Sequence, residues 1–197
     1  MVTIDGLIYA LLWLSFGAGH SLLAAPGGRG WLERRAGAAD RLAYNLIAVA
    51  HLAIVLGAGH LLLGGRAGYV LPAPLRAAMS VAAALGLAVL LLAGRAYDFG
   101  RFLGTTQLRR RAPDAAIAVE PLATGGINAW VRHPLYLGVL LILWGMVRSP
   151  FGLATAVWAS LYIAIGIRYE ERKLVRRYGA AYAAYRARVP MLLPWIR

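Results

Sequence analysis

The stretch Arg132-His133-Pro134-Leu135-Tyr136-Leu137-Gly138 opens the part of the chain that decides the fold. An apolar segment continues from it to Val147, and after Arg148-Ser149-Pro150 a second apolar segment returns as far as Ile167. The chain then leaves through Arg168-Tyr169-Glu170-Glu171-Arg172-Lys173-Leu174. This pattern predicts a short apolar hairpin whose two ends lie at the same membrane face. Both ends carry charged groups that apolar packing does not need, so we expect any active site where they meet.

The composition is that of an integral membrane protein. Hydrophobic residues make up 60% of the 197 residues, and the mean hydropathy is +0.63, whereas soluble domains have roughly 45–50% apolar residues. The length, without a Ser-, Gly- or Pro-rich linker, predicts a single membrane domain over residues 1–197. The formal charge of +13 lies mostly between apolar runs, which favours membrane lipids over nucleic acid as a partner. The absence of cysteine excludes disulfides, thiolate nucleophiles and cysteine zinc sites.

Five apolar runs predict an all-α protein with five transmembrane helices. Residues 1–93 form three N-terminal spans, at about 2–25, 42–63 and 75–93, with a basic loop after the first. Residues 94–133 form a cytoplasmic loop, and residues 134–197 form the hairpin and the C-terminal region. The first run has no basic residues before it, so it reads as a retained helix rather than a cleaved signal peptide.

The fourth run, residues 135–147, is shorter than a bilayer core. Its helix would measure about 20 Å, against roughly 30 Å of hydrocarbon. This mismatch draws the polar residues before it towards the lipid boundary. After Ile167, the pattern predicts a basic amphipathic helix over residues 168–178 that ends at Gly179, a second short helix over residues 180–188, and a tail that folds back on the cytoplasmic face.

The glycines and histidines of the N-terminal spans favour structural roles. Gly17-Ala18-Gly19 and Gly57-Ala58-Gly59 lack the third glycine of a dinucleotide fingerprint, and small residues in apolar helices usually permit close packing. His20, His51 and His60 have no carboxylate partner within the membrane, so we expect hydrogen bonding rather than a metal site.

The polar ends of the hairpin permit two interpretations. A proline at the first helical turn leaves the preceding amides free, so the start of this helix suits an anion, and Tyr136 lies on the same face as His133. An interfacial belt that reaches the headgroups is the alternative. Glu170 and Glu171 are the only adjacent acids. By spacing alone they would form local ion pairs, such as Glu170 with Lys173.

Three motifs in order resemble the isoprenylcysteine carboxyl methyltransferase superfamily. They are Arg132-His133-Pro134-Leu135-Tyr136-Leu137-Gly138, Glu170-Glu171-Arg172-Lys173-Leu174, and residues 178–190 with Pro194. This group comprises integral membrane methyltransferases that use S-adenosylmethionine (SAM), and it extends to phospholipid N-methyltransferases. The bacterial branch that includes methanethiol S-methyltransferases is most similar, through residues 165–171, residues 189–194, Gly19-His20-Ser21 and Phe102-Leu103-Gly104-Thr105-Thr106-Gln107.

The resemblance implies that SAM binds between the polar end of the hairpin and the C-terminal helices. It assigns cofactor contacts to the following residues: His133, Tyr136, Glu170, Glu171, Leu174 and Gln107. A carboxylate suits the ammonium of the cofactor, and an Arg/His cluster at a helix start suits its carboxylate. The chain departs from the family at Gly126-Ile127-Asn128, where relatives often carry an aromatic residue; Trp130 is the nearest substitute.

The resemblance leaves the methyl acceptor open. A small or lipophilic thiol leads, an isoprenylcysteine-type carboxylate or a phospholipid amine follows, and a non-catalytic membrane protein of the same shape is the alternative of another class. Methyl transfer from a sulfonium needs placement and a dry site rather than acid–base chemistry. A cation would favour an ionised thiol or carboxylate, so Arg168 and Arg132 are the candidate catalytic residues.

The Lys/Arg distribution predicts the orientation in a bacterial cytoplasmic membrane. An external N-terminus leaves only Arg66, Arg76 and Arg148 outside, and it keeps the other eighteen basic residues with the C-terminus in the cytoplasm. Reporter fusions at Arg148 and at the C-terminus should therefore report opposite sides. An external C-terminus would contradict this topology.

Overall fold

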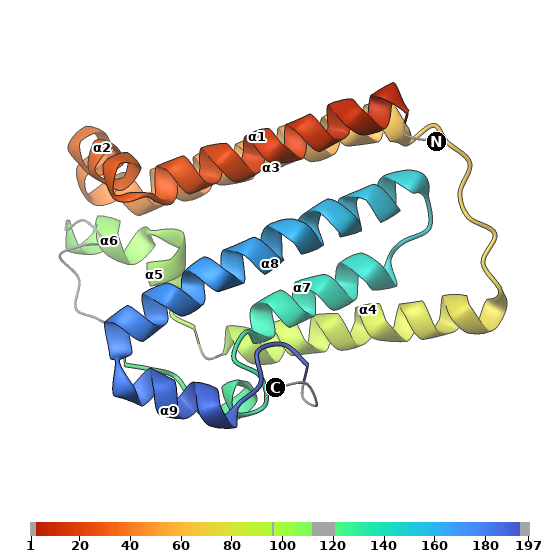
Figure 1. Ribbon diagram of the computed structural model, residues 1–197. Helices are drawn as coiled ribbons and strands as arrows, with labels where there is room; N and C mark the ends of the chain where they lie inside the picture. The colour runs from red at the N-terminus through yellow and green to blue at the C-terminus, as the bar shows by residue number, and fades with distance from the viewer. Residues whose placement is uncertain (1–2, 96, 112–120, 194–197) are drawn as a thin grey trace. The chain divides into compact units, whose positions relative to one another are not determined.

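The computed structural model describes residues 3–95, 97–111 and 121–193, and within these ranges every regular element is helical. This confirms the predicted all-α membrane fold. The helices form two compact units, Met1–Gly65 with Tyr97–Glu120, and Arg66–Ala96 with Pro121–Arg197. We call them unit 1 and unit 2. Figure 1 shows the elements of each unit by label and colour.

The bounds of the elements follow the apolar runs. Unit 1 contains α1 (Ile4–Ala24), α2 (Pro26–Ala36), the 3-10 helix η1 (Gly37–Ala39), α3 (Asp40–Leu63), α5 (Phe99–Leu103) and α6 (Thr105–Arg110). Unit 2 contains α4 (Ala73–Gly94), the 3-10 helix η3 (Gly126–Ala129), α7 (Pro134–Gly145), α8 (Pro150–Tyr178) and α9 (Ala180–Arg188).

Among the described residues, four helical segments are long and apolar enough to cross a membrane. They are α1, the continuous segment Pro26–Leu63, α4 and α8. The fifth predicted span, α7, has 12 residues and is shorter, as the sequence indicates. Many apolar side chains on these helices are exposed, including Leu11, Leu61 and Leu91. A bilayer would cover this surface.

Two predicted loops are helical instead. The basic segment after the first span is α2, in which Pro26 occupies the first turn, where proline needs no amide donor. The stretch after α4 contains α5 and α6. Their junction at Gly104 has a positive φ of 96°, and a Cβ there would lie 2.5 Å from the Leu42 nitrogen. The chain can therefore turn against α3 only with a glycine at this position.

In unit 1, α1 and α3 pack through aromatic and small residues. Tyr9, Trp13 and Phe16 are buried, and a Cβ on Gly59 would overlap the Tyr9 ring. Gly59 therefore serves close packing, as the sequence predicts, whereas a Cβ on Gly57 would meet no atom within 4 Å.

Two of the three histidines make hydrogen bonds across α1 and α3. His20 Nε2 lies 2.6 Å from the Tyr44 hydroxyl, and His51 Nε2 lies 3.2 Å from the Ser15 hydroxyl. Among the described residues, no group of three or more His, Cys, Asp and Glu side chains could hold a metal. The hydrogen bonds of His20 and His51 agree with the role predicted for these two side chains.

In unit 2, α4 and α7 lie side by side through glycines (Figure 1). A Cβ on Gly86 would lie 2.7 Å from the Gly138 carbonyl oxygen, and one on Gly145 would lie 2.6 Å from the Ala83 nitrogen. Because backbone atoms occupy these positions, the helices can approach this closely only without side chains there.

Arg148 fixes the turn between α7 and α8. Its Nη1 donates to the Gly145 and Val147 carbonyl oxygens at 3.0 and 2.8 Å, which satisfies acceptors at the end of α7. Ser149 then caps α8, because its hydroxyl accepts a hydrogen bond from the Gly152 nitrogen at 3.2 Å.

Helix α8 continues past Ile167 without a break and ends at Tyr178. The sequence interpretation of a new helix starting at residue 168 is therefore wrong. A change from apolar to charged side chains leaves the backbone hydrogen bonds intact, so it does not end a helix. The predicted stop at Gly179, with φ of 53°, and the second helix at residues 180–188 are confirmed. The end of the tail, with Pro194 and Trp195, lies outside the described residues.

We predict that Gly145→Ala destabilises the protein by about 1–3 kcal/mol, because its methyl group would overlap the backbone of α4. Gly166→Ala on α8 is the matched control, since a Cβ there meets no atom within 4 Å. Thermal unfolding in detergent, followed by circular dichroism, measures both variants. Equal midpoints for the two would contradict the close α4–α7 contact.

Candidate functional site

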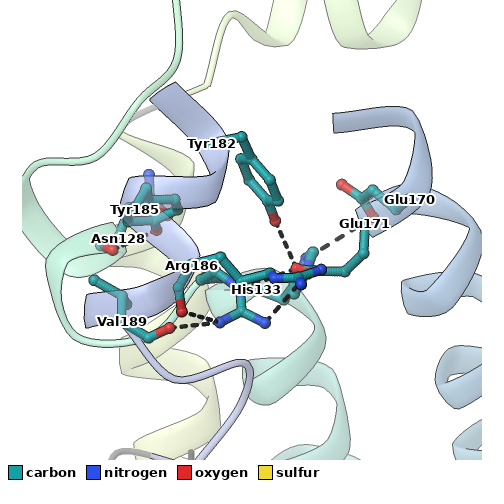
Figure 2. A network of polar contacts seen from close by, with 9 residues as sticks. Asn128, His133, Glu170, Glu171, Tyr182, Tyr185, Arg186 and Val189 are labelled. Atoms are coloured by element: carbon teal, nitrogen blue, oxygen red, sulfur yellow. Dashed lines mark hydrogen bonds and ion pairs between the residues drawn. The ribbon is translucent and has the colours of Figure 1, made fainter. Parts of the chain in front are cut away.

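Glu171 is the centre of a buried polar network in unit 2, which Figure 2 shows from close by. Its Oε1 accepts hydrogen bonds from Arg132 Nε at 2.9 Å, His133 Nε2 at 2.8 Å and Tyr182 Oη at 2.5 Å. Its Oε2 accepts one from Arg132 Nη2 at 3.2 Å. A carboxylate has about four acceptor positions, so this network leaves Glu171 little capacity for a further ligand.

The burial of this network makes it costly to disturb. The side chains of Glu171, Arg132 and His133 are 8%, 7% and 3% exposed. A charged side chain that is buried away from water is tolerated only when it is paired and hydrogen-bonded. The two-pronged contact with the Arg132 guanidinium is the strongest geometry for such a pair.

The start of α7 brings Arg132 and His133 to this site. His133 precedes Pro134 at the first position of α7, so its own amide lies outside the helix. The Arg132 and His133 amides donate to the Pro190 and Met191 carbonyl oxygens at 2.9 and 3.2 Å. The free amides predicted at this helix start therefore hold the C-terminal tail.

The Arg132 side chain also anchors the end of α9. Its Nη1 donates to the Val189 carbonyl oxygen at 2.5 Å and to that of Arg186 at 3.3 Å. Arg132, which the sequence proposed as a catalytic candidate, thus uses its guanidinium on Glu171 and on two backbone carbonyls. This arrangement favours a positioning role for Arg132.

The sequence interpretation missed Tyr182 as a member of the network. The turn at Gly179 sends α9 back beside α8, and Tyr182 and Tyr185 become buried with Val189. The Tyr185 hydroxyl donates to the Asn128 carbonyl oxygen at 2.5 Å. Burial, together with the hydrogen bond to Glu171, raises the pKa of Tyr182, so its hydroxyl stays protonated and donates. The i, i+3 spacing of the two tyrosines was the available signal.

Two further predicted residues, Tyr136 and Glu170, lie beside the His133 ring, and a third, Leu174, lies in the apolar cluster of α9. The Tyr136 and His133 ring centroids are 5.7 Å apart, and Glu170 Oε2 is 4.0 Å from His133 Nδ1. The Glu170 side chain is 41% exposed, so it can still accept a ligand. Leu174 packs against the cluster of Tyr182, Tyr185 and Val189.

Arg168 and Glu171 both line a groove of about 680 Å³. The groove has an apolar part formed by Ala164, Ile167, Val175, Met191 and Leu192, and a charged part formed by Arg168, Glu171, Arg172, Arg176 and Arg186. Its volume is within the range of roughly 300–1,000 Å³ that is typical of small-molecule sites. The structure therefore separates the predicted residues into two groups, one in this groove and one beside His133.

Gln107, the remaining predicted cofactor contact, belongs to unit 1. Its side chain is fully buried, and its Nε2 donates to the Arg101 carbonyl oxygen at 3.1 Å. Trp130, the aromatic residue closest to the family position, is 72% exposed, while the backbone of Asn128 binds Tyr185.

A sequence profile described as NnrU protein matches residues 7–148. This match covers more than half of the chain, so the chain belongs to the NnrU protein family. No solved structure matches the chain.

Similar proteins carry the names predicted by the resemblance. Methanethiol S-methyltransferase 2 of Bradyrhizobium diazoefficiens is 46% identical over 65 residues, 32% of this chain and 25% of that protein. A methanethiol S-methyltransferase of Mycobacterium tuberculosis is 42% identical over 67 residues, 34% and 28% of the two chains. Protein-S-isoprenylcysteine O-methyltransferase of Homo sapiens is 34% identical over 80 residues, 39% and 28%. The matches thus span about a quarter of the length of these relatives.

We predict that Glu171→Ala destabilises the protein by about 3–5 kcal/mol, because it leaves the buried Arg132 and His133 without their acceptor. The adjacent variant Glu170→Ala should change stability by less than about 0.5 kcal/mol, because that side chain is partly exposed and outside the network. Thermal unfolding in one detergent compares the two. Similar losses from both carboxylates would contradict the central position of Glu171.

Proposed function

We propose that this member of the NnrU family is a membrane enzyme that transfers a methyl group from SAM to a small or lipophilic thiol. The observation that carries the proposal is the groove in which the Arg168 guanidinium lies beside the Glu171 network and an apolar wall. The names of the relatives from B. diazoefficiens and M. tuberculosis support the reaction class and the acceptor.

The residues of unit 2 fit the chemical groups of SAM. Arg186, whose side chain is 55% exposed, suits its carboxylate, and Glu170 is the carboxylate that still has room for its ammonium. Val175 and Leu192 in the groove offer apolar surface to its adenosyl part. His133 is fixed by Glu171, and we propose that Tyr136 and Leu174 contact the edge of the cofactor that extends past His133. Gln107 remains a predicted contact.

When bound, SAM supplies a methyl group that is activated by the positive sulfur. The acceptor sulfur forms a new bond to the methyl carbon while the bond from that carbon to the sulfonium breaks, and the thiol proton goes to water. The chain needs to hold the two sulfurs in line, with the nucleophile about 3–3.5 Å from the methyl carbon. The apolar wall keeps water away from this step.

Arg168 favours the reactive form of the acceptor in this proposal. No ion pair with a carboxylate of the described residues involves Arg168. A guanidinium beside a thiol stabilises the thiolate and lowers the thiol pKa from about 8.5. A neutral amine gains nothing from such a cation, so a thiol is favoured over a phospholipid amine. An isoprenylcysteine-type carboxylate is the second candidate, because it would pair with the same charge and the human relative acts on such a group by its name.

We predict that Arg168→Gln lowers thiol methylation about tenfold at neutral pH, the effect of roughly one unit in the thiol pKa. The loss should shrink as the pH approaches 8.5, where the thiol ionises without help. Methyl transfer from SAM to methanethiol, a longer alkyl thiol, a farnesylated cysteine analogue and phosphatidylethanolamine measures the preference. Arg177→Gln removes the same charge from α8 outside the groove and serves as the control.

Two outcomes would contradict this function. Turnover on the phospholipid amine alone, or a thiol rate that Arg168→Gln leaves unchanged at every pH, would remove the thiol assignment. Calorimetric titration with SAM and with its demethylated product tests the broader proposal. If folded protein binds neither, the chain is a non-catalytic membrane protein of the same fold.

A further inference from the structure

Three arginines follow one another along the groove at intervals of four residues. Arg168, Arg172 and Arg176 all line it, and each step along α8 raises the position by about 6 Å. Viewed down the helix, Arg172 and Arg176 are turned by about 100° and 140° from Glu171. They therefore form an outer rim of the groove, while Arg168 lies nearer its inner end.

This rim carries charge that no carboxylate of the described residues neutralises. No carboxylate of the described residues makes an ion pair with Arg172 or Arg176. The Arg172 guanidinium lies 5.7 Å from the centre of the Tyr169 ring, which is a contact without a negative charge. Like charges four residues apart on a helix repel each other, so an anion at the rim would relieve this repulsion.

The rim also lies at the level of the lipid headgroups. The apolar part of α8, residues 150–167, measures about 27 Å, close to the hydrocarbon core of roughly 30 Å. Arginine side chains on a helix lean towards its N-terminus, which for α8 is the direction of the membrane. The Arg172 guanidinium is therefore brought to the headgroup layer. Below it, the exposed Ala164 provides apolar surface within the same groove.

We propose that Arg172 and Arg176 bind the phosphate of an anionic membrane phospholipid, whose acyl chain lies against α8 at Ala164. Arginine forms paired hydrogen bonds with phosphate oxygens, and two neighbouring guanidiniums match one phosphodiester and the net negative charge of the lipid. Along α8, Ala164 precedes Arg172 and Arg176, so the acyl chain and the phosphate of the lipid meet them in that order. A lipid at this rim closes the outer side of the groove and leaves Arg168 to the inner end.

Native mass spectrometry of the detergent-solubilised protein tests this site. We expect phosphatidylglycerol to be retained and phosphatidylcholine to be lost under the same activation. The double variant Arg172→Gln/Arg176→Gln should bind phosphatidylglycerol at least about tenfold more weakly, because it loses two charge-assisted contacts. The double variant Lys173→Gln/Arg177→Gln removes the same charge from neighbouring positions that do not line the groove, and it should bind like the wild type.

Three results would overturn the proposal. Equal weakening by both double variants would mean diffuse attraction to the basic helix. Equal binding of inorganic phosphate and of phosphatidylglycerol would mean that the rim holds a free anion and not a lipid. Displacement of the lipid by the demethylated product of SAM would assign the two arginines to the cofactor. Because lipid binding is measured without methyl transfer, its failure and that of the proposed function are distinguishable.

Discussion

The burial of one negative charge, on Glu171, constrains the whole C-terminal half of the chain. A carboxylate this far from water requires opposite charge and hydrogen-bond donors in fixed positions. Its donors come from the start of α7 and from α9. The continuation of α8 beyond its apolar part and the turn at Gly179 are the features that bring them together. The C-terminal helices are therefore held by polar contacts as much as by the apolar cluster around Tyr182.

Arginine side chains stabilise both ends of helix α7, each through different hydrogen bonds. At its start, Arg132 joins Glu171 and the backbone at Val189. At its end, Arg148 occupies the carbonyls that the helix leaves open. Between them, contact with α4 depends on glycines. A helix of 12 residues makes few contacts of its own, so these external restraints determine where its polar start lies.

The sequence predicted most of what depends on local pattern. The apolar runs, the stop at Gly179 and the short helix after it follow from hydropathy and from glycine geometry, and the structure confirms them. The sequence also predicted the region in which Arg132 and His133 meet Glu171, because a hairpin brings its two ends to one face. The resemblance to named methyltransferases added the reaction class.

What the sequence missed depends on contacts that spacing does not encode. The sequence did not predict that three side chains donate hydrogen bonds to Glu171, and Tyr182 was not recognised among them. The segment around Arg34 is helical, although its charged residues led us to predict a loop. The groove depends on Met191 and Leu192 folding back over α8, and no local pattern predicts which residues a tail will face.

Because α8 is continuous, any tilt of its membrane-spanning part also moves the part that lines the groove. The part of this helix beyond Ile167 extends about 16 Å as a rigid rod joined to the spanning part. A transmembrane helix adjusts its tilt to the thickness of the bilayer. A change of 10° would move the far end of this segment sideways by about 3 Å along the lipid surface, from its length and the sine of the angle. Bilayer thickness therefore influences where along the lipid surface the groove opens to molecules dissolved in the membrane.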